Sequence, residues 1–227
     1  MATSRRKKVF LSAGVVLAVT ALLGLGTMAS FTAQTKNPGN AFANGTLVLS
    51  NTKQGGSACL STGGGSTDTN VNDNCDTLLN LSVRKPGDSG TANLTVANVG
   101  SLDASVFKTF AVACTNGDAS AESYHGTGSP CSKLQLYVQE WSDSGFSTAS
   151  SCLYGGGTAT TCDFSDTAKT LSDFQTNHNS SANGVDLGGV TAGTSKYYTI
   201  GVKLPTDADN TYQGRQATID FTWFASE

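Results

Sequence analysis

The segment Tyr198-Thr199-Ile200-Gly201-Val202-Lys203-Leu204 alternates large apolar side chains with small or polar ones. Successive side chains of an extended strand point to opposite faces, so this period of two predicts a strand with one face on a core. Clean alternation of this kind is typical of antiparallel sheets that keep one face in water. The segment therefore predicts an all-β fold.

The same period recurs along the chain. Apolar side chains alternate at Leu47 and Leu49; at Leu79, Leu81 and Val83; at Ala92, Leu94 and Val96; at Leu134, Leu136 and Val138; and at Ala217, Ile219, Phe221 and Trp223. We also expect 106–113 to be extended and a short helix over 165–174. So many half-buried strands predict two sheets packed face to face, a jelly-roll-like antiparallel β-sandwich.

The first thirty residues have the organisation of an export signal. Arg5-Arg6-Lys7-Lys8 is basic, 9–28 is apolar and uncharged, and small residues follow. This order predicts a cleaved secretory signal over 1–29, with cleavage after Ala29 or, as the alternative, after Ser30. The apolar run is long enough to span a bilayer, so a retained membrane anchor is the alternative.

The charge of the mature chain excludes one large class of partners. Removing residues 1–29 leaves 198 residues and takes away four of the 14 basic residues, so 10 Lys and Arg face 17 Asp and Glu, a net charge of −7. A surface of that sign disfavours nucleic acid, whose phosphates attract basic proteins. It suits a soluble exported protein.

Six cysteines follow the signal, at Cys59, Cys75, Cys114, Cys131, Cys152 and Cys162. An even number in an exported chain indicates disulfides, and the lack of any Cys-x-x-Cys pair disfavours a zinc site. Six cysteines permit many pairings, so connectivity stays open. We favour the three sequence-local pairs, Cys59–Cys75, Cys114–Cys131 and Cys152–Cys162, one for each of the polar stretches 51–76, 115–132 and 142–162. These stretches are expected to be insertions between strands.

The two histidines offer little for catalysis. His125 and His178 lie in polar, loop-like contexts, and neither has the spacing of a metalloprotease motif. There is no Gly-x-Ser-x-Gly elbow, and oxidised cysteines cannot serve as nucleophiles. A Ser/His/Asp triad is undecided, because its members meet only in space. We assign no catalytic residue, no metal ligand and no cofactor.

Two further stretches contain residues that some binding sites use. Oxygen-bearing side chains over 68–76 resemble a calcium loop, but Asp73 and Leu79 occupy the positions where an EF-hand has Gly and Glu. We therefore expect an ordinary polar loop. Tyr197-Tyr198 and Trp141 are the aromatics from which a sugar-binding platform could be built, although a single aromatic strand is more often core.

Three segments together resemble the TasA/camelysin family of exported bacterial proteins, which includes biofilm-matrix fibre subunits. The first is Ala41-Phe42-Ala43-Asn44-Gly45-Thr46-Leu47-Val48-Leu49, shortly after the signal. The second is Val83-Arg84-Lys85-Pro86-Gly87-Asp88 with Leu94-Thr95-Val96-Ala97-Asn98-Val99-Gly100-Ser101-Leu102. The third is Tyr212-Gln213-Gly214, which leads into the last strand.

The resemblance implies a jelly-roll-like sandwich, a SipW-type signal removed by a dedicated signal peptidase, and, for some members, assembly into fibres. Pro86, Gly87, Asp88 and Gly214 match family turns and have backbone roles. The six cysteines and the Gly/Ser-rich insertions depart from familiar members. Camelysin-type members have been classed as metallopeptidases, but no residue here matches a zinc motif, so that activity is not carried over.

These observations predict a secreted, non-enzymatic structural protein of the bacterial cell surface or extracellular matrix. It would comprise a signal over 1–29, an arm over 30–43 and a β-sandwich over 44–227. Phe31, Ala33 and Thr35 alternate along the arm, which we expect to pair with a sheet edge of a second copy. Contact with the membrane would come only through an uncleaved signal. The alternatives are a monomeric adhesin or binding module, and a secreted hydrolase.

Overall fold

The protein is described from a computed structural model, which covers residues 43–64, 70–80 and 85–227. Its longer strands are β1 (Leu49–Lys53), β3 (Ser89–Asn98), β4 (Val106–Phe110), β5 (Cys114–Asp118), β6 (Gln135–Trp141), β7 (Ala149–Tyr154), β11 (Ser195–Lys203), β12 (Arg215–Ile219) and β13 (Thr222–Ser226). Four two-residue strands are β2 (Cys59–Leu60), β8 (Gly156–Gly157), β9 (Cys162–Asp163) and β10 (Val185–Asp186). The helices are α2 (Pro130–Lys133) and α3 (Leu171–Asn177), with 3-10 turns η1 (Ser61–Gly64) and η2 (Asn210–Tyr212).

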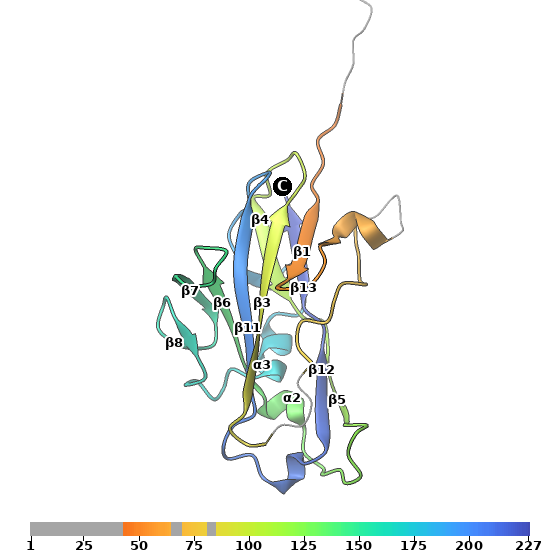
Figure 1. The fold of residues 1–227 in the computed structure, drawn as a ribbon, viewed down its shortest axis with the longest axis vertical. Helices are drawn as coiled ribbons and strands as arrows, with labels where there is room; N and C mark the ends of the chain where they lie inside the picture. Colours follow the sequence, from red (N-terminus) through yellow and green to blue (C-terminus); the bar gives the residue numbers. More distant parts are fainter. Residues whose placement is uncertain (1–42, 65–69, 81–84) are drawn as a thin grey trace, which may run out of the picture. The chain divides into compact units, whose positions relative to one another are not determined.

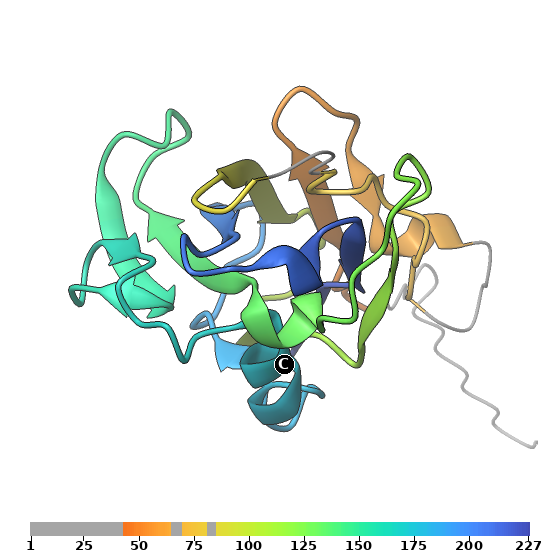
Figure 2. The same cartoon turned by 90° about the horizontal axis from the view of Figure 1, so that it is seen from below.

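One layer is a six-stranded antiparallel sheet in the order β2-β1-β3-β11-β6-β7. The alternating residues 198–203 belong to β11, which lies between β3 and β6. In Figure 1 the strands β7, β6, β11, β3 and β1 lie side by side across the view, with β4 and β13 behind them. Figure 2 shows the β7–β9 region at one side of this sheet and the β1–β2 region at the other.

The second layer is a long two-stranded ribbon that is interrupted once. β4 pairs with β13 and β5 pairs with β12, and β10 adds two residues beside β4. The register changes by one residue between the two halves, because 111–113 lie opposite only 220–221. Ala111 donates its N–H to the carbonyl of His178, at the end of α3. The last expected strand is therefore two strands, β12 and β13, joined at Asp220 and Phe221.

The core lies between the two layers. Leu94, Val96, Phe107, Tyr198 and Ile200 are at most 1% exposed. Tyr198 stacks on Trp223 with ring centroids 5.3 Å apart, and Phe107 lies 6.3 Å from each of them. This aromatic cluster joins β11 to β4 and β13. The arrangement confirms the expected all-β antiparallel sandwich.

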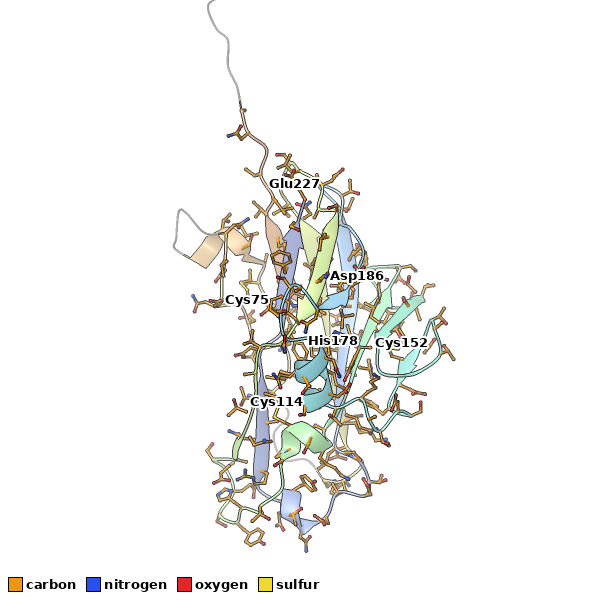
Figure 3. The ribbon with its side chains drawn as sticks, turned by 180° about the vertical axis from the view of Figure 1, so that it is seen from behind. Cys75, Cys114, Cys152, His178, Asp186 and Glu227 are labelled. Carbon is orange, nitrogen blue, oxygen red and sulfur yellow. A yellow bond between two sulfur atoms is a disulfide. The ribbon has the colours of Figure 1, made fainter. Side chains whose placement is uncertain are left out.

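Three disulfides close the three sequence-local loops that the cysteine spacing favoured. The pairs are Cys59–Cys75, Cys114–Cys131 and Cys152–Cys162, and no described cysteine is free. Figure 3 shows Cys75, Cys114 and Cys152 in three separate regions of the domain. Each disulfide therefore fastens its own local loop to the sandwich.

The helix expectation over 165–174 was partly wrong, because α3 begins at Leu171. Thr170 is the N-cap residue, and its hydroxyl accepts a hydrogen bond from Asp173 N at 3.1 Å. A threonine in that role places the start of a helix just after it. Residues 165–170 are not helical, and the helix extends past Phe174 to Asn177.

The three disulfide-closed stretches contain strands that the sequence reasoning treated as insertions. β5 has the polar sequence CTNGD, and β7 reads ASSCLY. Neither alternates, so neither gave a strand signal. The strand expected at Leu79, Leu81 and Val83 is not formed at Leu79, which is irregular, and 81–84 lie outside the described residues.

Candidate functional site: an open strand edge

Strands β12 and β13 form an edge of the sandwich that no further described strand covers. Each of these strands is the last of its sheet, and among the described residues no strand or backbone hydrogen bond occupies the outer side of β13. Unpaired N–H and C=O groups along a strand form a template for pairing with another chain. This edge is therefore a candidate binding site for an added strand.

The inward side chains of this edge are also incompletely covered. Ala217, Ile219, Phe221, Trp223 and Ala225 pack against the core, and each remains partly exposed. The corresponding inward residues of the central strand β3 are closed off, with Leu94 at 0% and Val96 at 1% exposure. A further strand at this edge would bury these apolar side chains, which are partly exposed to solvent.

Two polar atoms inside the aromatic cluster have no partner in the described part of the chain. They are the Tyr198 hydroxyl and Trp223 Nε1, both buried. A buried donor without an acceptor is rare in folded proteins and costs stability. Burial raises the pKa of Tyr198, and the negative charge of Glu140 adds to that shift. Its hydroxyl therefore stays neutral.

The opposite edge of the six-stranded sheet, at β7, is closed in three ways. The β6–β7 ladder changes register twice, between Val138 and Gln139 and between Glu140 and Trp141, so β7 contains two bulges. Bulges disrupt an edge as a template for pairing. The chain then folds back, and Cys152 N donates to Ala159 O at 2.9 Å. The Cys152–Cys162 disulfide fastens this return.

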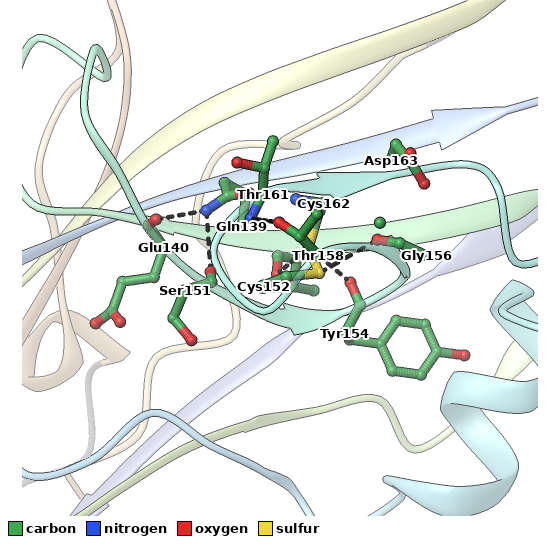
Figure 4. Close-up of a disulfide and its surroundings, with 12 residues drawn as sticks. Gln139, Glu140, Ser151, Cys152, Tyr154, Gly156, Thr158, Thr161, Cys162 and Asp163 are labelled. Atoms are coloured by element: carbon green, nitrogen blue, oxygen red, sulfur yellow. Dashed lines mark hydrogen bonds between the residues drawn. A yellow bond between two sulfur atoms is a disulfide. The ribbon is translucent and has the colours of Figure 1, made fainter.

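Gln139 holds the same loop from underneath. Its side chain is 2% exposed, and Nε2 lies within 3.0 Å of the carbonyl oxygens of Glu140, Ser151 and Thr160. Its Oε1 accepts from Cys162 N at 2.6 Å. Figure 4 shows Gln139 between Glu140, Ser151 and the disulfide. No sequence pattern indicated a role for Gln139, since a glutamine on the polar phase of a strand carries no signal of burial.

The short edge at β2 is covered by its own disulfide loop. Asn72 Nδ2 donates to Leu60 O at 2.8 Å, and Cys59–Cys75 joins the two segments. Asn72 Oδ1 accepts from Asn74 N at 3.0 Å. The described part of the calcium-like stretch thus fastens its loop to β2. Among the residues that the structure covers, no three His, Cys, Asp or Glu side chains group as metal ligands would.

The turn residues lie where backbone geometry demands them. Gly87 has φ +96°, and its N–H donates to Leu204 O at 2.8 Å beside the end of β11. Asp88 closes the turn by donating its N–H to Lys85 O at 3.0 Å. Gly214 has φ +65°, and a Cβ there would lie 1.9 Å from Tyr124 O. Both glycines therefore have the backbone roles that were expected.

Both histidines support loops. His125 Nδ1 is 2.7 Å from Gly214 O, next to the turn just described. His178 Nδ1 is 2.8 Å from Asn183 O, and its ring packs against Tyr154 and Phe174. His178 is therefore half-buried, although its context in the sequence is polar and loop-like.

The signal and arm residues fall outside the described residues: Ala29, Ser30, Phe31, Ala33 and Thr35. The domain is anchored from Thr46 onward, where Ser101 N donates to Thr46 O at 2.7 Å and Val99 N donates to Val48 O at 2.8 Å. No helix in the described ranges is long and apolar enough to cross a membrane.

Comparison with known proteins returned no family model that matches this chain. A search of curated proteins likewise returned no significant match.

Proposed function

We propose that this chain is a secreted structural subunit that assembles into extracellular fibres, in a bacterial matrix or at the cell surface. Assembly would proceed by donation of the N-terminal arm, 30–43, to the β12–β13 edge of a second copy. The observation that carries this proposal is the partly exposed apolar row along that edge, together with the outer side of β13, which no strand among the described residues occupies.

The arm has the chemistry that such an edge would accept. An added strand forms main-chain hydrogen bonds with the edge, and its alternate side chains select the register. Phe31, Ala33 and Thr35 would point toward the partly exposed row, while Thr32 and Gln34 would face solvent. Burial of Phe31 over Trp223 and Ala225 would remove apolar surface of both copies from water.

The geometry of donation favours a filament. Donation of the arm of one copy to the edge of the next is a head-to-tail contact, and its repetition from copy to copy yields a filament. Residues 30–43 could extend over about 45 Å, enough to reach a neighbour. Asn37-Pro38-Gly39-Asn40 would serve as the hinge between arm and domain.

The extracellular space is the compartment that best fits the chain. Three disulfides are consistent with an extracellular location, because disulfides persist in oxidising environments. We further propose membership of the TasA/camelysin family, on the strength of the three motifs described above. On this proposal, removal of 1–29 by a signal peptidase frees the arm, so cleavage would permit assembly as well as release.

The test uses the full chain secreted from a bacterial host, with N-terminal sequencing and electron microscopy of the same sample. We expect a mature N-terminus at Ser30 and filaments. Phe31→Asp with Ala33→Asp should abolish filaments, because both changes place charge on the face that contacts the acceptor. The matched control, Thr32→Asp with Gln34→Asp, adds the same charge to the other face and should leave filaments intact.

The acceptor edge is tested in the same way. Ala225→Lys places a charge on the inward side of β13 and should prevent assembly, whereas Thr218→Lys lies on the exposed side of β12 and should not. Filaments that persist when 30–40 are deleted would rule out donation. A monomeric protein in all samples would favour an adhesin or binding module instead.

A further inference from the structure

The outer face of the six-stranded sheet carries an aromatic row that the core does not use. Tyr197 on β11 is directly opposite Trp141 on β6, and Tyr137 is opposite Gly201 in the same ladder. These positions have the phase opposite to that of the core residues Tyr198 and Ile200, so their side chains project outward. In Figure 1 β4, β13 and α3 lie behind the sheet, on its other face. On the outward face, the β7–β9 return covers the part of β6 around Gln135 and Gln139, which are buried.

The rings of this row are held in place and only half-buried. Phe146 packs edge-on against Tyr197 with centroids 6.1 Å apart, and Phe164 lies 4.9 Å from Tyr137. The Tyr137 ring covers Gly201 so closely that a Cβ there would lie 2.3 Å from the ring. Rings fixed in this way lose little freedom on binding, which favours recognition of a ligand.

Polar groups alternate with the rings on the same face. Trp141 Nε1 donates to Thr199 Oγ1 at 2.7 Å, and Asn93 Nδ2 donates to Gln54 Oε1 at 3.0 Å. Thr95 lies opposite Tyr197 on the other neighbouring strand, β3. Within the described ranges the hydroxyls of Tyr137, Tyr197 and Thr95 make no hydrogen bond, and neither phenol is among the buried unpartnered atoms. They remain available to a ligand.

The face carries almost no charge. The residues of this phase on the three central strands are Ser89, Thr91, Asn93, Thr95 and Ala97; Ser195, Tyr197, Thr199, Gly201 and Lys203; and Gln135, Tyr137, Gln139 and Trp141, of which Thr199, Gln135 and Gln139 are buried. Lys203 is the one charged side chain of this set, and it lies 5.7 Å from the Phe164 ring at one end. The nearby Glu140 and Lys196 have the inward phase and pair with each other at 3.5 Å. The face therefore matches an uncharged ligand that is rich in hydroxyl groups.

We propose that this face binds a neutral polysaccharide. The C–H faces of pyranose rings stack on aromatic side chains, and sugar hydroxyls form hydrogen bonds with Thr, Asn and Tyr groups. This face offers partners for both the apolar and the polar parts of a sugar. Trp141, Tyr197 and Phe146 form the continuous part of the platform, since Gln139, between Tyr137 and Trp141 on β6, is buried under the β7–β9 return. Three adjacent rings offer stacking surface to more than one sugar residue of an oligosaccharide.

This inference goes beyond the proposed function and does not depend on it. The aromatic row lies on β6 and β11, whereas the proposed acceptor edge lies on β12 and β13. Loss of sugar binding and loss of assembly can therefore be observed separately. A protein that binds sugar without forming filaments would support the polysaccharide inference and contradict the proposed assembly.

The test measures binding of the secreted mature protein to defined oligosaccharides by calorimetry. Neutral probes are cellohexaose, laminarihexaose and mannohexaose, and the anionic probe is an alginate hexamer. We expect at least one neutral hexamer to bind, with at least tenfold weaker binding of the corresponding monosaccharide. Fluorescence supplies a second readout, since Trp141 and Trp223 are the two tryptophans of the chain. A Trp223→Phe background isolates the signal of Trp141.

Tyr197→Thr keeps a residue that favours strands and removes the ring, so the sheet should persist while affinity falls at least tenfold. Tyr124→Ala is the control. Tyr124 is 59% exposed and lies in a loop outside this sheet, so its loss should leave affinity unchanged. Circular dichroism checks that both variants are folded. No binding to any neutral hexamer, binding of alginate alone, or equal affinity for Tyr197→Thr and the parent protein would each overturn the proposal. So would a Tyr197→Thr variant that loses filaments and not sugar, which would identify the face as a contact between copies.

Discussion

The two lateral edges of the sandwich are finished to different degrees. At β7 the chain has two register changes, a disulfide and a buried glutamine that contacts three carbonyl groups. At β12–β13 no described strand lies outside, the inward apolar row is partly wet, and Trp223 Nε1 is buried without an acceptor. Sheets that end without protection tend to add further strands. The difference indicates that this fold resists addition at β7 and leaves β12–β13 available.

The largest effect is expected from removing the disulfide at the closed edge. Cys152→Ser with Cys162→Ser opens a loop with a sequence separation of 10, which should lower the free energy of unfolding by about 3 kcal/mol in urea titrations. The amides of β7 should also exchange faster with solvent. Cys59→Ser with Cys75→Ser is the control, since it should cost similar stability without affecting exchange at β7. Equal hydrogen exchange at β7 in both variants would show that the Cys152–Cys162 disulfide does not specifically protect this edge.

A smaller loss should follow Gln139→Leu. The leucine fills similar space but leaves the N–H of Cys162 and buried carbonyls without their partner. Unsatisfied buried groups of this kind cost about 2 kcal/mol in total. Denaturant unfolding measures the loss, and the disulfide should still form. An unchanged midpoint would mean that water replaces the glutamine at no cost.

A tyrosine-to-phenylalanine substitution should have opposite effects on stability near the two edges. The Tyr154 hydroxyl donates to Asp173 Oδ2 at 2.7 Å, so Tyr154→Phe should destabilise by about 1 kcal/mol. The Tyr198 hydroxyl has no described partner, so Tyr198→Phe should stabilise by about 1 kcal/mol. Thermal unfolding of the two variants provides the comparison. A destabilised Tyr198→Phe would show that its hydroxyl has a partner in the folded protein.

The smallest effect concerns alkaline pH. Burial raises the pKa of both Tyr154 and Tyr198 above the ordinary value near 10, and the hydrogen bond to Asp173 adds to the shift at Tyr154. As pH passes 10 the unfolded chain loses these protons and the folded chain keeps them, so stability falls as pH rises. At pH 10 each tyrosine should lower stability by about 0.4 kcal/mol relative to neutral pH. Each Phe variant should lose less stability than the parent between pH 8 and pH 10; an identical loss would refute this account.

Much of the fold is predictable from local pattern. Alternation at Leu94 and Val96 and at Tyr198 and Ile200 predicted strands and their inward faces, because burial of one face imposes a period of two on the strand. β7 escaped prediction for a physical reason: its two bulges shift the phase, so ASSCLY does not alternate. β5 escaped because its strand depends on pairing with β12, not on its own polar side chains.

The candidate site is less predictable than the fold. The alternation at Ala217, Ile219 and Trp223 indicated a strand with an inward face, but it could not indicate that the strand ends a sheet. Similarly, Tyr197 and Trp141 were visible as aromatics, and only the register placed them opposite each other on the outer face. Tyr198, which follows Tyr197 in the sequence, is part of the core.

By itself, the sequence determined the all-β class and the inward and outward phases of the regular strands. It also favoured three local disulfides. All of these depend on residues close together in the chain. The tertiary structure alone decided which strands became edges, that Gln139 closes one of them, and that two aromatics meet on an open face. Strand order and register join segments that are far apart in sequence, so no local pattern contains them.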